Sequence, residues 1–205
     1  MVSGTAKRDG FLPHHRHDRS MVTAVVGAIW LAIVLGFGID IVKRAHDHTL
    51  TFSLITHLHA VAYTGWLVLL AAQVFLVRTG RVAAHRRLGR AALILLPSML
   101  FLGPATAYYG VADNPYMPDK WIAWLSVNYT NAVGAIALLI AGLLTRRSPA
   151  AHKRLMVMGT IALTEPGFSR IWMPFLEARL GEDYMAFYFS TYIGTFLLVA
   201  DRSVV

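Results

Sequence analysis

The sequence predicts an all-α protein, a bundle of six transmembrane helices that contains an internal repeat of two helix–hinge–helix hairpins. Three observations support this fold class: the composition, six long apolar stretches, and two related segments. The 205-residue chain is 56% hydrophobic and only 15% charged, whereas soluble domains are typically about a quarter charged. We therefore expect a protein embedded in a lipid bilayer.

Each apolar stretch is about long enough for a helix to cross a hydrocarbon core of roughly 30 Å. The first stretch follows a polar tail, is longer than a signal-peptide core, and is not followed by an A-x-A-like cleavage site, so it is expected to be retained. The last two are the weakest, because one contains Glu165 and Arg170 and the other is rich in Tyr. The predicted spans are about 21–39, 53–77, 88–109, 121–144, 154–174 and 184–200.

The segment AAHRRLGRAALILL at 83–96 aligns with AAHKRLMVMGTIAL at 150–163, and seven of the fourteen positions are identical. This match predicts repeated hairpins at about 53–109 and 121–174 within a membrane domain at 21–200. In the same register Pro97, which is expected to break its helix, aligns with a position two residues before Pro166. Matching interruptions in two repeats favour a binding site between them.

The net charge of +8 is distributed unevenly along the chain. The basic tail 1–20, the hinges 78–90 and 145–154, and the C-terminus 201–205 contain most of the Lys and Arg. This positive-inside pattern predicts cytoplasmic termini in a bacterial inner membrane. The expected partner is the lipid bilayer, with a homodimer or a membrane complex left open, and no nucleic acid is expected.

Polar side chains concentrate toward the non-cytoplasmic half of the predicted bundle. One face of the second span carries a stripe of mostly polar and aromatic side chains: Thr56, His59, Tyr63, Trp66, Leu70 and Gln73. This stripe should face protein, because unpaired polar groups are costly in lipid. The depth of each residue in the membrane can be estimated from the span ends at 1.5 Å per residue. By this estimate several other polar groups lie at the midplane or in the outer half, and Arg170 lies nearer the outer boundary. We expect a polar pocket that opens toward the non-cytoplasmic side. The residues expected to line it are His57, His59, Tyr63, Trp66, Gln73, Asn128, Asn131, Glu165, Arg170, Tyr188 and Tyr192.

The histidines suggest a redox cofactor, either haem b or a divalent metal. The haem-ligand candidates are His57, His59, His85 and His152. His85 and His152 are equivalent in the repeat and could converge, although their position between Arg and Lys favours an interfacial anchor. A weaker metal site would use His46, His48 and His57.

Two other classes of protein remain open. A small-molecule or proton-coupled transporter would use Glu165 as its coupling group, because an intramembrane carboxyl is usually functional. In a non-catalytic accessory subunit every polar residue would be structural. No nucleophile–base pair or phosphate-binding loop is present, so no catalytic residue is assigned, and the absence of cysteine excludes thiolate metal sites.

The segment HLHAVAYTGWLVLLAAQVFLVRTGRVAAHRRLG resembles the recurring core of an uncharacterised bacterial family of small polytopic membrane proteins. The resemblance covers about a sixth of the chain and implies a six-helix topology without implying an activity. In the weaker second copy Met156 replaces the glycine of the motif. The positions that carry the resemblance are His57 or His59, Trp66, Gln73, Gly80, Arg81, His85, Arg86, Leu88 and Gly89.

Overall fold

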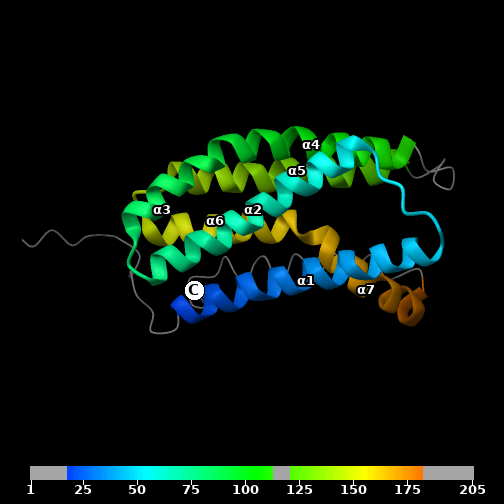
Figure 1. The fold of residues 1–205 in the computed structure, drawn as a ribbon, viewed down its shortest axis with the longest axis horizontal. Coiled ribbons are helices and arrows are strands. Elements are labelled where there is room, and N and C mark those ends of the chain that lie inside the picture. The colour runs from blue at the N-terminus through cyan, green and yellow to red at the C-terminus, as the bar shows by residue number, and fades with distance from the viewer. Residues whose placement is uncertain (1–17, 113–120, 182–205) are drawn as a thin grey trace, which may run out of the picture.

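The structure, a computed structural model, describes residues 18–112 and 121–181, and every regular element in these ranges is helical (Figure 1). The all-α class is therefore confirmed. The helices are α1 (Asp18–His46), α2 (Leu54–Arg78), α3 (Val82–Leu88), the 3₁₀ turn η1 (Gly89–Ala91), α4 (Ala92–Ala112), α5 (Trp121–Leu144), α6 (Pro149–Leu163) and α7 (Glu165–Leu180).

Four helical segments of the described chain are long and apolar enough to span a membrane: 20–46, 54–78, 82–110 and 125–144. They correspond to the first four predicted spans. The predicted fifth span is instead two helices, α6 and α7, of 15 and 16 residues. The predicted sixth span at 184–200 and the segment 201–205 lie outside the described residues.

α1 extends to His46, several residues beyond the end of the first predicted span at about 39. The reason is local, because Arg44 donates a 3.0 Å hydrogen bond to the carboxylate of Asp40, one turn earlier in the helix. Such i,i+4 pairs support an additional helical turn.

α4 is continuous through both of its prolines, so the predicted break at Pro97 is wrong. A proline removes one backbone donor, but packing of the neighbouring turns can keep a membrane helix intact. Here Leu96, just before Pro97, and Met99, two residues after it, are both buried in the core. An interruption is found instead at Thr164, between the end of α6 at Leu163 and the start of α7 at Glu165.

The helices α2, α4, α5 and α6 form a chain of packed neighbours, and α7 packs mainly on α1. α5 and α6 approach closely, since a Cβ at Gly159 would lie 2.7 Å from the side chain of Leu139. Large apolar side chains such as Leu93 and Phe101 remain exposed on the outside of the bundle. Such exposed apolar side chains are suited to contact with lipid tails.

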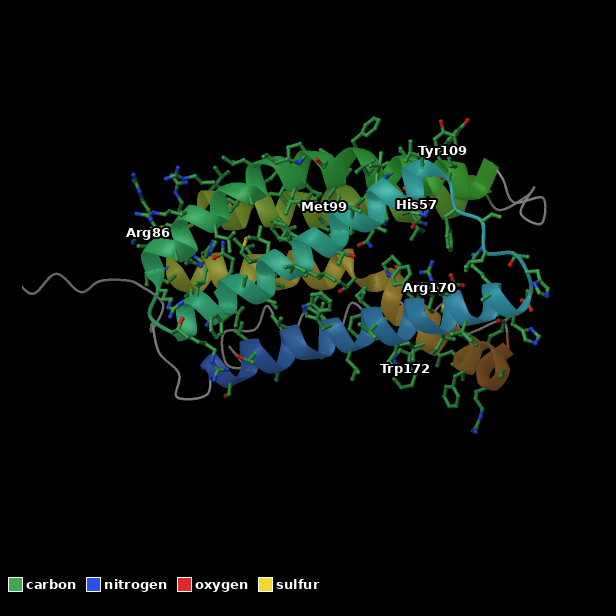
Figure 2. All side chains as sticks on the ribbon, viewed as in Figure 1. His57, Arg86, Met99, Tyr109, Arg170 and Trp172 are labelled. Atoms are coloured by element: carbon green, nitrogen blue, oxygen red, sulfur yellow. The ribbon has the colours of Figure 1, made fainter. Side chains whose placement is uncertain are left out.

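The junctions 79–81 and 145–148 lie at one end of the elongated molecule, which we call the hinge end (Figure 1). Arg86 lies at this end, whereas His57 and Tyr109 lie at the opposite, outer end (Figure 2). Within 78–90 and 145–154, all of it described, the chain has no Asp or Glu. The basic residues of these two segments are Arg78, Arg81, Arg86, Arg87, Arg90, Arg146, Arg147, Lys153 and Arg154.

Candidate functional site

The two hinge histidines lie close together at the hinge end. His85 on α3 and His152 on α6 have ring centroids 6.3 Å apart, with their planes nearly perpendicular at 87°. Nδ1 of His152 lies 2.7 Å from the carbonyl oxygen of Gly142 on α5. Because a carbonyl only accepts, His152 must donate from Nδ1, which leaves its Nε2 with a free lone pair.

The other ring is held from α2. The His85 ring lies within hydrogen-bonding range of the backbone carbonyl of Gln73, and the amide nitrogen of Gln73 lies 3.2 Å from where a Cβ on Gly89 would be. Gly89 therefore leaves space for the Gln73 side chain. Both Gln73 Oε1 and His85 Nδ1 are buried without a hydrogen-bond partner among the described residues.

The stripe predicted on α2 does turn toward protein. Trp66, only 2% exposed, donates its indole N–H to the hydroxyl of Thr160 on α6 at 3.1 Å. Thr160, which is fully buried, in turn donates to the carbonyl of Met156 at 2.8 Å. This chain of hydrogen bonds joins α2 to α6 in the middle of the bundle.

Toward the outer end the same stripe contacts α4. The rings of His59 and Tyr63 are stacked with centroids 4.0 Å apart. The Tyr63 hydroxyl donates to the carbonyl of Met99 at 3.2 Å, and its oxygen occupies the space that a side chain on Gly103 would need. His59 Nδ1 is buried and lacks a hydrogen-bond partner among the described residues.

The joint between α6 and α7 is held by α5. The side-chain amide of Asn131 donates to the carbonyl of Ala162 at 3.0 Å. The Thr164 hydroxyl donates to the carbonyls of Thr160 and Ile161, each at 3.0 Å. The carbonyls of Thr160 and Ile161 also accept the backbone N–H of Thr164, so the hydroxyl gives each a second donor, whereas the Ala162 carbonyl receives a donor from α5.

Arg170 contacts α1 rather than lying free at the surface. Its guanidinium donates to the carbonyl of Pro166 at 2.6 Å, lies 3.9 Å from the carboxylate of Asp40, and stacks over the ring of Phe37 at 4.3 Å. Glu165, the first residue of α7, is half-buried. A charged side chain thus links α7 to α1 near the outer end.

Several of the residues predicted to line one outer pocket bond to different helices, but Arg170 lies within electrostatic range of both His59 and Glu165. His59 and Tyr63 pack on α4, Asn131 packs on α6, and Arg170 packs on α1. Asn128 is half-buried, and Tyr188 and Tyr192 lie outside the described residues. The side chains of His59, Asn131 and Glu165 are each at least partly buried, so none points freely at lipid.

The predicted outer metal site is not supported. His46, His48 and His57 are all exposed, and no group of three or more His, Asp or Glu side chains in the described chain is placed to hold a metal ion. His46 instead pairs with Asp47 at 3.2 Å, and His57 bonds the carbonyl of Ser53 at 2.9 Å. His57 and His59 differ in exposure, as expected from their separation around the helix.

Sequence reasoning missed two hydrogen-bond acceptors. Thr160 accepts from Trp66, and the carbonyl of Gly142 accepts from His152. Thr160 falls at a repeat position with no polar counterpart, and Gly142 contributes only its backbone carbonyl. A backbone acceptor has no signature in the sequence, so Gly142 could be identified only from coordinates.

The four long apolar helices and the buried hydrogen bonds between them indicate a helical membrane protein. Comparison of the chain with protein-family models, curated proteins and solved structures finds no match. Any assignment of function therefore depends on the site itself.

Proposed function

We propose that this protein binds a haem through His85 and His152 at the hinge end and serves as an electron-transfer component of a bacterial inner membrane. The proposal rests on one observation, the pairing of two repeat-related imidazoles across the hinge junction. Their centroids are 6.3 Å apart, and the donor bond from Nδ1 of His152 fixes its tautomer.

The spacing matches two imidazoles on opposite sides of one ion. A metal–nitrogen bond of about 2 Å on each side, plus roughly 1 Å from nitrogen to ring centre, places the ring centres roughly 6 Å apart. Ligating histidines usually donate their other ring N–H to a carbonyl or carboxylate. His152 already makes this bond to Gly142.

The surrounding charge distinguishes haem from a bare divalent ion. Residues 78–90 and 145–154 contain nine Lys and Arg and no acidic residue. This positive field opposes binding of a free divalent cation by two neutral ligands. A porphyrin neutralises its iron and carries two carboxylates, which such a basic end attracts.

The expected chemistry is electron transfer, because axial coordination by both imidazoles leaves no open position for a substrate. Farther from the hinge end than the ring pair, the described core contains buried aliphatic side chains such as Leu69, Ala92 and Val157. We also propose that the hinge end faces the cytoplasm, following the positive-inside rule.

The absorption spectrum of the detergent-purified protein tests this function. We expect a Soret band that is lost in both His85→Ala and His152→Ala. His57→Ala is the matched control, because His57 is exposed at the outer end and should leave the band unchanged. A wild-type protein without haem, purified from cells supplied with a haem precursor, would contradict the proposal.

The joint at Thr164 favours a second function, proton-coupled transport. Broken helices often mark transport sites, and the joint places the carboxyl of Glu165 at the start of α7. In that case Glu165→Gln would abolish uptake driven by a proton gradient in proteoliposomes. Uptake that survives this change would exclude Glu165 as the coupling group.

A further inference from the structure

The ends of three helices meet at the hinge end of the molecule (Figure 1). The rings of His85 on α3 and His152 on α6 have centroids 6.3 Å apart. His152 also donates from Nδ1 to the carbonyl of Gly142, close to the end of α5, at 2.7 Å. Residues that flank these contacts in the sequence are therefore brought to one region of the surface, although they come from two distant segments.

This region carries positive charge without a balancing carboxylate. The segments 78–90 and 145–154, all of them described, contain no Asp or Glu. Guanidinium groups favour phosphate and carboxylate oxygens, which they can bind through two parallel N–H donors. A complementary ligand is therefore an anion supplied from outside the described chain. The exposed basic side chains of the two segments are Arg78, Arg81, Arg86, Arg87, Arg90, Arg146 and Arg147.

Exposed apolar side chains adjoin these arginines in both segments. Leu88 directly follows Arg87 and is exposed, and Leu93 at the start of α4 is 70% exposed. Leu144, the last residue of α5, is 78% exposed and lies two residues before Arg146. A soluble anion would contact only the arginines. A phospholipid suits both groups, because its phosphate pairs with guanidinium and its acyl chains pack on leucine.

We propose that the hinge end is a binding site for an anionic phospholipid. Arginines of 78–90 and 145–154 hold the headgroup phosphate, and the acyl chains lie along the exposed apolar side chains of α4 and α5. Basic surfaces at the cytoplasmic ends of membrane helices bind such headgroups in other proteins. The inference does not depend on the proposed haem function, because exposed arginines, and not the two imidazole rings, hold the lipid.

The first test measures the melting temperature of the delipidated full-length protein in a non-ionic detergent with added lipid. Phosphatidylglycerol is compared with phosphatidylcholine of the same acyl chains, because only phosphatidylglycerol has a net negative headgroup. At about 100 times its dissociation constant, phosphatidylglycerol should raise the melting temperature by roughly 5–10 °C, and phosphatidylcholine should raise it much less. Inorganic phosphate at the same concentration should have little effect, because it has no acyl chains to contact α4 and α5.

The second test removes one exposed cation from each segment by combining Arg86→Gln with Arg147→Gln (Figure 2). Glutamine has a helix propensity similar to that of arginine, so the fold should be retained. The shift caused by phosphatidylglycerol should fall to that caused by phosphatidylcholine. The matched control combines Lys43→Gln with Arg179→Gln, which removes the same charge from exposed positions in the last turns of α1 and α7. This control should keep the full shift.

Three results would overturn the lipid site. Equal shifts with the two lipids would show that the headgroup charge is irrelevant, and an equal shift with inorganic phosphate would show that the ligand is a free anion. An equal loss in both double variants would show that net charge, and not the hinge end, determines the effect. The comparison of lipids uses the wild type, so it gives an answer even if a variant does not fold.

The lipid site and the haem function can fail separately. A protein that is stabilised by phosphatidylglycerol but binds no haem would contradict only the proposed function. A protein that binds haem but responds equally to both lipids would contradict only the lipid site.

Discussion

The side-chain amide of Asn131 donates to the carbonyl of Ala162, the acceptor that Pro166 leaves without its helical donor. In an uninterrupted helix this carbonyl would receive the N–H of residue 166, which proline lacks. A side chain from the neighbouring helix α5 supplies the missing proton. Such replacement is how membrane helices tolerate proline within the bilayer.

Replacing Asn131 should destabilise the α6–α7 joint because the Ala162 carbonyl would lose its donor. We expect Asn131→Leu to lower the free energy of unfolding by about 1–3 kcal/mol, measured by denaturation in detergent. In a Pro166→Ala background the restored N–H can replace the amide, so the same change should have a smaller effect. An equal loss in both backgrounds would contradict this account.

The bond between Trp66 and Thr160 should couple α2 to α6. Thr160→Val leaves a buried indole N–H unpaired and should destabilise the protein by about 1–3 kcal/mol. Adding Trp66→Phe removes that donor, so the double variant should lose less than the sum of the single losses. Trp172→Phe is the control, because Trp172 is 52% exposed and its ring contacts Phe175 on its own helix, α7. Strictly additive losses would show that the bond does not contribute.

α1 and α7 cross at a pair of glycines. A Cβ on Gly36 would collide with the backbone carbonyl of Gly167, so Gly36→Ala should lower the melting temperature, with an overpacking loss of about 1–3 kcal/mol. Gly27 and Gly38 lie on the same helix with open space around them. Alanine there should be neutral or stabilising because it favours the helix. The crossing is misplaced if all three variants melt alike.

The orientation of the hinge end can be measured directly because the chain has no native cysteine. Single cysteines at Arg86 and Arg147 should react with an impermeant thiol reagent only after the membrane is opened. A cysteine at Leu50, in the loop at the outer end, should react in intact cells. Labelling of Leu50→Cys and Arg86→Cys from the same side would exclude the proposed topology.

Helix class and the first four spans were predictable because each long apolar stretch specifies its own helix. The inward direction of the α2 stripe was also predictable, since its period of three and four places Trp66 and Tyr63 on one face. Whether each proline region would interrupt its helix was not predictable. Pro97 sits within a continuous helix and Pro166 follows a break, and the difference lies in tertiary contacts such as the Asn131 bond.

The candidate site was only partly predictable for the same reason. The repeat indicated that His85 and His152 could converge, but their spacing depends on how α3 and α6 pack. The prediction of an outer pocket assumed that polar side chains at the same depth in the membrane contact one another. Depth does not determine which neighbour a side chain bonds, because His59 stacks on Tyr63 and Asn131 bonds Ala162, although Arg170 lies within electrostatic range of His59.

The electron paramagnetic resonance spectrum of the oxidised protein tests the central claim most directly. If His85 and His152 bind one iron, the wild type will show the low-spin ferric signal of two axial imidazoles, and His85→Ala and His152→Ala will each lose it. A high-spin signal in the wild type, or a low-spin signal that survives both substitutions, would contradict the claim.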